Sequence, residues 1–327
     1  MATTALDRSA LPSLAEISDA QQLVYSVMPP TPQFVWPLLC ERLGTEAWVK
    51  HENYTPIGAF KARTAVVYAA ELFGTASHVS GLVTATRGNH GQSVALAAKR
   101  FNVPAFVVAP RGNSTAKNAA MRAQGANLIE YGGDFQEAKE HAQSLASKNN
   151  WHFVPNYHRD IVKGVGTYWL EFFSAVRNLD TVYVPIGQGS GICSCSAVRN
   201  GMGLKTKIVG VVAEGAPAYA LSFAAGHAVA APVSTVLADG MACRVPDEEA
   251  LDVILSNVER IVTVSEQEIA DAMKIYFTDT HNVVEGAGAA GLAAALKEKD
   301  LLRGTCVGLV ASGGNVDREL FARILAN

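Results

Sequence analysis

Lys61 stands at a position that is unusual for a lysine. It lies in residues 51–63, HENYTPIGAFKAR, where an expected strand ends in a turn containing proline and glycine and a helix is expected to open on Phe60 and Lys61. The first turn of a helix carries the positive end of the helix dipole, which disfavours an ammonium group. A lysine with a disfavoured ammonium form is suited to imine formation and proton abstraction. The alternative is an ordinary solvent-exposed lysine in a first helical turn.

A second segment, residues 84–92 (TATRGNHGQ), joins an expected strand to an expected helix through Gly88 and Gly91. Such a turn presents backbone N–H groups and a helix N-terminus, and both favour a carboxylate or phosphate. His90 taken alone is more typical of a structural cap. The surrounding residues, Thr86, Asn89 and the two glycines, favour an anion site.

A third segment, residues 184–194 (VPIGQGSGICS), has alternating glycines at 187, 189 and 191 after the strand TVYVPI. These glycines let the backbone close round a phosphate at the start of the next helix. A plain tight turn is the structural alternative. A dinucleotide-binding oxidoreductase is the alternative from another cofactor class, but the third glycine of its fingerprint would fall at Ile192, and Lys61 would have no role.

The fourth segment, residues 311–317 (ASGGNVD), follows the last expected strand. Two glycines after Ser312 could mark only a turn. Ligands of α/β sheets, however, bind at the carboxyl ends of parallel strands. We therefore count Ser312 as a candidate ligand-binding residue.

These segments lie on a chain that alternates apolar β-branched segments with segments of helical spacing. This pattern predicts an α/β fold with mainly parallel sheets and no internal repeats. The expected strands are residues 46–51, 81–85, 105–109, 127–131, 181–186, 208–213, 260–264 and 306–311. The expected helices are residues 60–73, 90–101, 114–124, 134–148, 161–176, 266–281 and 286–297. The proline-rich residues 28–37 are expected to be extended.

From Thr31 to Asp317 the four segments, in this order, resemble the fold-type II pyridoxal-phosphate (PLP) enzymes, especially the threonine and serine dehydratase and serine racemase group. The resemblance implies that Lys61 is the Schiff-base lysine and catalytic base. It also implies that Asn89 reaches the ring hydroxyl of PLP and that Ser312 faces the pyridine nitrogen. The cofactor-binding residues that it implies are Phe60, Lys61, Asn89, Gly187, Gln188, Gly189, Ser190, Gly191 and Ser312. The substrate-binding residues that it implies are Thr86, Arg87, Gly88, Asn89 and His90.

The same resemblance implies a domain organisation and a reaction. Two three-layer αβα domains are expected: a large PLP-binding domain of residues 1–80 and 158–327, and an inserted small, mobile domain of residues 81–157. The expected reaction is dehydration and deamination of threonine, serine, 3-hydroxyaspartate or 3-phenylserine to a 2-oxo acid and ammonia. Cysteine-synthase-like β-replacement and racemisation are the alternatives within PLP chemistry. A catalytically silent binding protein would be expected to lack Lys61.

Two positions depart from the family pattern. Arg87 stands where racemases of the group carry a serine that moves protons, and a guanidinium does not lose its proton in proteins. We therefore expect little or no racemase activity, and we expect Arg87 to pair either with the substrate carboxylate or with an acidic side chain. Relatives that bind a divalent cation use two acids, but Glu214 and the Ala218 carbonyl are followed by Ala220 where the second acid would stand. We therefore expect no metal site.

Charge and composition limit the kinds of partner that we expect the protein to bind. The net charge of −3 without long charged runs gives little support for a nucleic-acid partner. The first residues lack the pattern of a signal peptide, and no stretch is long and apolar enough for a membrane span. Five cysteines do not predict a disulfide framework, and Cys193 and Cys195 are expected to be buried thiols in a helix. We expect a cytoplasmic homodimer or other homo-oligomer acting on a small amino acid, without a C-terminal regulatory domain.

Overall fold

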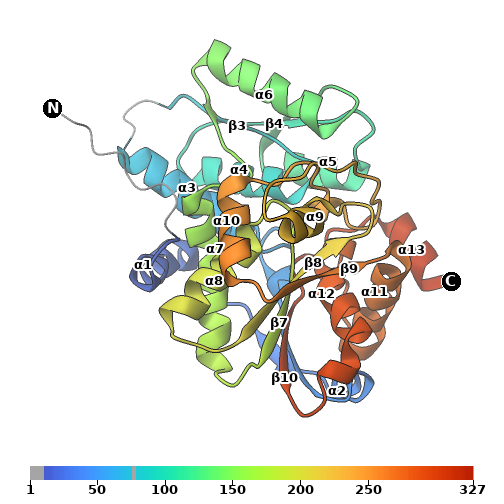
Figure 1. The fold of residues 1–327 in the computed structure, drawn as a ribbon. Coiled ribbons are helices and arrows are strands. Elements are labelled where there is room, and N and C mark those ends of the chain that lie inside the picture. The colour runs from blue at the N-terminus through green and yellow to red at the C-terminus, as the bar shows by residue number, and fades with distance from the viewer. Residues whose placement is uncertain (1–10, 76–78, 327) are drawn as a thin grey trace.

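The computed structural model describes residues 11–75 and 79–326, which form two β-sheets with helices on both faces of each (Figure 1). The prediction about a signal peptide refers to residues 1–22, of which residues 1–10 lie outside the described part. No helix within the described part is both long and apolar enough to cross a membrane.

The larger sheet has six strands in the order β1-β2-β10-β7-β8-β9. Only the edge strand β1 is antiparallel to its neighbour, and all other pairs are parallel. The strands are β1 (Gln33–Val35), β2 (Glu46–Lys50), β7 (Thr181–Pro185), β8 (Lys207–Ala213), β9 (Arg260–Val264) and β10 (Cys306–Val310).

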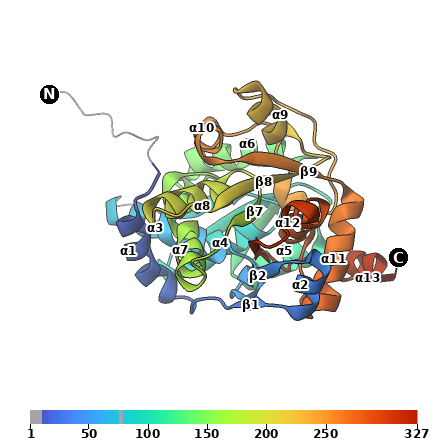
Figure 2. The ribbon, with the colours of Figure 1, turned by 60° about the horizontal axis from the view of Figure 1, so that its bottom comes forward.

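Helices cover both faces of this sheet (Figure 2). One face carries α1 (Leu14–Tyr25), α7 (Arg159–Ala175), α8 (Ser190–Gly201) and α10 (Glu248–Asn257). The other carries α2 (Pro37–Leu43), α11 (Glu266–Thr280), α12 (Gly286–Lys297) and α13 (Arg318–Ala326). Side chains of β7 alternate between the two cores: Val182 and Val184 pack with α7 and α8, and Tyr183 packs with α12.

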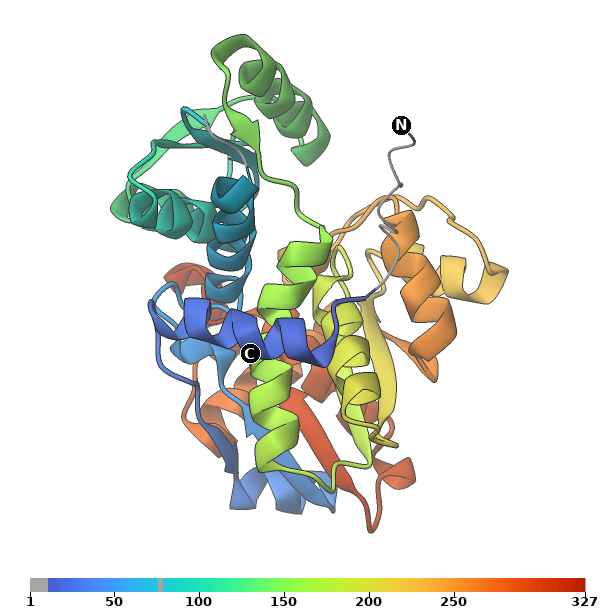
Figure 3. The same cartoon turned by 90° about the vertical axis from the view of Figure 1, so that its left-hand side faces the viewer.

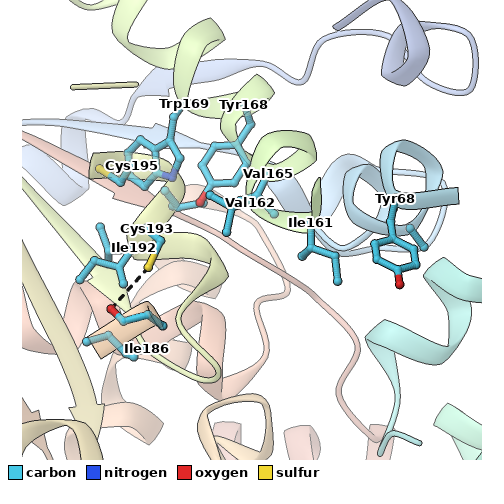
Figure 4. Packing of buried hydrophobic residues seen from close by; sticks show 14 of the residues in the cluster. Tyr68, Ile161, Val162, Val165, Tyr168, Trp169, Ile186, Ile192, Cys193 and Cys195 are labelled. Atoms are coloured by element: carbon cyan, nitrogen blue, oxygen red, sulfur yellow. Dashed lines mark hydrogen bonds between the residues drawn. The ribbon is translucent and has the colours of Figure 1, made fainter. Parts of the chain in front are cut away.

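The core between α7 and α8 is dense and apolar (Figure 4). Trp169 is fully buried, and its indole N–H donates to the carbonyl of Gly191 over 3.0 Å. Cys193 and Cys195 are fully buried in α8, as expected for thiols in a helix. Through Trp169, this core is hydrogen-bonded to Gly191, which lies next to the loop after β7.

The smaller sheet has four parallel strands in the order β5-β4-β3-β6. They are β3 (Leu82–Ala85), β4 (Ala105–Ala109), β5 (Ala126–Glu130) and β6 (His152–Phe153). Helices α4 (Asn89–Arg100) and α5 (Thr115–Ala123) cover one face, and α6 (Phe135–Asn149) covers the other. Figure 3 shows this three-layer unit beside the larger body, next to α3 (Ala62–Thr75) and α7.

The expected fold class is confirmed, and each of the eight expected strands is present within one residue of its expected ends. The expected start of α3 was wrong. Two successive turns precede this helix, with Ala62 N–H donating to the Ala59 carbonyl and Arg63 N–H donating to the Phe60 carbonyl. Lys61 therefore lies in the turn just before the helix instead of within it.

Candidate active site

A cavity of about 1020 Å³ lies where the loops after β2, β3, β7 and β10 meet. All four loops follow the carboxyl ends of parallel strands, and three of these strands, β2, β10 and β7, lie side by side in the larger sheet. Every site residue predicted from the sequence lines this one cavity. These residues are Phe60, Lys61, Thr86, Arg87, Gly88, Asn89, His90, Gly187, Gln188, Gly189, Ser190, Gly191 and Ser312.

Lys61 reaches into the cavity from the turn before α3. Its Nζ lies 3.3 Å from the hydroxyl of Ser190 and 5.0 Å from the centre of the Phe60 ring. Burial lowers the pKa of the Lys61 amine to about 8, because a charged ammonium loses hydration there. The free-base fraction of this amine near neutral pH is therefore far larger than that of an ordinary lysine, although the ammonium form still predominates at pH 7.

The turn that carries Lys61 is tied to the loop after β10. The backbone N–H of Phe60 donates to the carbonyl of Ser312 over 2.9 Å, and Ala59 forms an isolated antiparallel bridge with Gly313. The Ser312 hydroxyl lines the cavity and has no side-chain partner among the described residues. Two segments far apart in the sequence thus form one wall of the site.

The glycine loop after β7 forms a cradle of backbone N–H groups. Gly189 has a φ of +97°, a left-handed conformation that favours glycine, and it is the N-cap of α8. No described side chain caps this helix, so its first N–H groups and its positive dipole end remain available to a ligand in the cavity. Such an arrangement suits a phosphate.

The loop after β3 forms a second uncapped helix start. Gly88 is the N-cap of α4, again without a side-chain cap among the described residues, and its N–H donates to the Thr86 hydroxyl over 3.0 Å. His90 is almost fully buried, and its pKa is lowered to about 3, first by burial and then by the nearby Lys61 charge. The His90 ring is therefore neutral, and the anion-binding capacity of this loop comes from its backbone.

Arg87 is exposed on the cavity wall, and its carbonyl accepts a hydrogen bond from the Asn113 amide over 3.0 Å. No acidic side chain in the described part of the chain forms an ion pair with the Arg87 guanidinium. An anion on the substrate stays as its proposed partner.

The sequence analysis did not predict six charged residues of the cavity wall, which are Lys117, Asp134, Lys139, Asp239, Arg244 and Glu285. Lys117 on α5 forms an ion pair with Asp239, which opens the short helix η2 (Asp239–Met241) of the larger body. Nothing in the sequence indicates a pair 122 residues apart. Glu285 is detectable in principle, because it directly precedes the glycine- and alanine-rich start of α12.

Glu285 is almost fully buried between the two sheets. Its Oε1 accepts a hydrogen bond from Asn89 Nδ2 over 2.7 Å. Burial raises the pKa of Glu285 to about 7, although the nearby Lys117 charge opposes the shift. The site thus contains an amine and a carboxyl group that both titrate near neutral pH.

Among the described residues, no group of three or more His, Cys, Asp or Glu side chains is arranged to hold a metal ion. Glu214, the first acid of the loop considered above, is exposed.

The chain is similar to a protein family, to characterised enzymes and to solved structures. A family model described as pyridoxal-phosphate dependent enzyme matches residues 26–313. The chain is 35% identical to an L-threonine ammonia-lyase of Thermotoga maritima over 314 residues, which cover 96% of this chain and 78% of that enzyme. It is 32% identical to an L-threo-3-hydroxyaspartate ammonia-lyase of Saccharomyces cerevisiae, with 97% of both chains covered. The solved structure of maize serine racemase is similar with a TM-score of 0.89 and 27% identity, covering 97% of this chain and 98% of that one.

Proposed function

Because the chain belongs to the family of pyridoxal-phosphate-dependent enzymes, we propose that Lys61 binds the cofactor and then moves the proton at Cα of a β-hydroxy amino acid. The reaction is the PLP-dependent β-elimination of a hydroxy amino acid, which yields a 2-oxo acid and ammonia. The single observation that carries the roles of the residues is the position of Lys61, whose lowered pKa and contact with Ser190 place a free amine beside the glycine loop.

The residues of the cavity fit PLP. The uncapped start of α8 and the loop ending at Gly191 offer backbone donors for its phosphate. Lys61 offers an amine for its aldehyde, and Ser312 a hydroxyl for its ring nitrogen. When bound, PLP supplies a conjugated ring that takes up the electrons left at Cα when a proton departs.

Lys61 is suited to act as the base because its free amine form is populated near neutral pH. Lys61 Nζ donates to the Ser190 hydroxyl over 3.3 Å, and this contact helps to hold the amine in place while its lone pair stays available. Ser312 is neutral at the ring nitrogen, where it cannot hold a proton as a carboxylate would. We infer that this moderates electron withdrawal and favours prompt loss of the β-hydroxyl over slower carbanion chemistry.

We assign the substrate α-carboxylate to the loop of residues 86–90. Its backbone N–H groups and the positive end of α4 both favour an anion there. Arg87 lies on the same wall without an acidic partner in the described structure, so its guanidinium can add a charge-assisted hydrogen bond.

We propose threonine, serine, 3-hydroxyaspartate and 3-phenylserine as the substrates to be compared. Support comes from relatives named for L-threonine and for L-threo-3-hydroxyaspartate. The test is a panel assay that measures 2-oxo acid and ammonia together for each amino acid. Equal amounts of both products are expected for at least one of the four. Release of ammonia without a 2-oxo acid, or of neither product, would contradict the proposal.

We also propose that residues 81–157 act as a small mobile domain and that the protein is a cytoplasmic homodimer or other homo-oligomer. The edge strand β1 supports the assembly, because it pairs on one side only and exposes Phe34 and Val35 beside exposed Leu38 of α2. Light scattering with mass determination tests this part, and a monomer at micromolar concentration would contradict it.

A further inference from the structure

We propose that Glu285 is a positioning residue that orients the side-chain amide of Asn89, so that this amide presents a hydrogen-bond donor, and not its carbonyl, to the cofactor. The inference rests on the proposed function, because Asn89 faces PLP only if the cavity binds it.

The direction of the hydrogen bonds around Asn89 is fixed by a main-chain carbonyl. Asn315 Nδ2 donates to the carbonyl of Ile57 over 2.8 Å, and a carbonyl can only accept. The same Nδ2 lies 2.8 Å from Asn89 Oδ1. Both hydrogens of the Asn315 amino group are thus used, and the oxygen of Asn89 must be the atom that faces Asn315.

The amino group of Asn89 therefore points to the opposite side, where Glu285 Oε1 accepts one of its hydrogens over 2.7 Å. The second hydrogen has no acceptor among the described residues, and Asn89 lines the cavity. A ligand group beside Asn89 must then be an acceptor, such as an ionised oxygen on an aromatic ring.

Glu285 is itself held rigidly. Its backbone N–H donates to the Gly313 carbonyl over 2.9 Å, and a side chain on Gly313 would collide with Glu285 Oε1. Glycine at this position of the SGGN sequence therefore permits the close approach of the carboxyl group. The other oxygen, Oε2, is buried without a hydrogen-bond partner in the described structure.

Positioning of Asn89 requires an acceptor at Oε1 but not a negative charge. If Glu285 is protonated, the proton can reside on Oε2, and Oε1 still accepts from Asn89. A glutamine can turn its own carbonyl oxygen towards Asn89 and mimic the protonated form. A methionine of similar length offers no comparable acceptor, so the Asn89 amide would be free to flip.

The test measures the affinity of the full-length apoprotein for PLP by equilibrium dialysis. Glu285→Met is expected to weaken the affinity about tenfold, while Glu285→Gln stays within about threefold of the wild type. Thermal unfolding of each apoprotein reports on folding separately. If glutamine weakens binding as much as methionine, the charge matters and the proposal is wrong. It is equally wrong if methionine has no effect.

A double mutant separates positioning from a general structural role. Because Glu285 acts through Asn89, Asn89→Ala and Asn89→Ala/Glu285→Met are expected to bind PLP with equal affinity. A further loss in the double mutant would overturn the inference. Failure of the wild type to bind PLP would contradict the proposed function as well, whereas normal binding with additive losses contradicts only the role of Glu285.

Discussion

Arg63 donates two hydrogen bonds to Glu52, from Nε over 2.8 Å and from Nη2 over 2.9 Å, and both side chains are fully buried. Arg63 also donates to Glu171 on α7, and Lys50 completes the group with a 2.6 Å contact to Glu171. This network fixes the first turn of α3, where Arg63 lies two residues after Lys61. The position of the Lys61 amine thus depends on a buried cluster of charges.

Removal of Arg63 should therefore destabilise the fold. Arg63→Met leaves Glu52 buried without its cation, and breaking such a pair costs about 3–5 kcal/mol. Urea unfolding of the apoprotein measures the change. The control is Arg318→Met, because Arg318 and Glu319 form an exposed pair whose loss should leave stability nearly unchanged. Equal stability of the two variants would contradict a structural role for the buried network.

The pKa of Lys61 predicts how stability changes with pH. The folded-state value of about 8 lies below the ordinary value of 10.5, so between these two the unfolded chain binds more protons. Stability of the apoprotein should therefore rise as pH increases from 8 to 10.5. Lys61→Met should remove this part of the rise and should stabilise the apoprotein at pH 7. Unfolding curves of both proteins across this range provide the measurement. If the free energy of unfolding depends on pH in the same way in both proteins, burial does not lower the pKa of Lys61.

Because an arginine stands at position 87, we expect the enzyme to eliminate water without racemising its substrate. A second acid/base group is needed opposite Lys61, and a guanidinium cannot lose its proton. Chiral chromatography of residual substrate during turnover should show no accumulation of the opposite enantiomer, and its appearance would refute this prediction.

The contact between Arg87 and the substrate is tested by Arg87→Ser. Loss of a charge-assisted hydrogen bond should lower kcat/KM about tenfold. An unchanged kcat/KM would mean that the guanidinium does not touch the substrate.

Lys117 and Asp239 should hold the two sheet units together across the cavity. Asp239→Asn removes the charge that pairs with Lys117, so the contact between α5 and η2 across the cavity is weakened and KM should rise about fivefold. Asp300→Asn is the control, since Asp300 is exposed and forms its ion pair with the nearby Arg303. If both variants have wild-type KM values, the ion pair does not contribute to substrate binding.

The sequence predicted the strands well because each carries a run of apolar β-branched residues, as in TVYVPI. β1 and β6 escaped prediction because they are only three and two residues long. The helices that were not predicted include α1, α2, α9 (Ala218–Ala225), α10 and α13. Of these, α1 was detectable, because Ser13 and Glu16 form a capping box at its start.

The site was predictable where a motif is local and unpredictable where partners are distant in sequence. Lys61 and the glycine loop are each recognisable within a dozen residues. By contrast, Asn89 and Glu285 are 196 residues apart, and only the packing of the two sheet units brings them together. The expected start of α3 lay two residues too early. The apolar spacing of the helix already begins at Phe60, although this residue lies in the turn before the helix.

Covalent labelling of the protein with its cofactor tests the central claim most directly. The holoenzyme is reduced with borohydride, digested, and mapped by mass spectrometry for the pyridoxyl group. We predict one labelled peptide, carrying the group on Lys61, and no label at this position in Lys61→Ala, which should also lose elimination activity. A pyridoxyl group on any other lysine of the wild type, with Lys61 unmodified, would contradict the account.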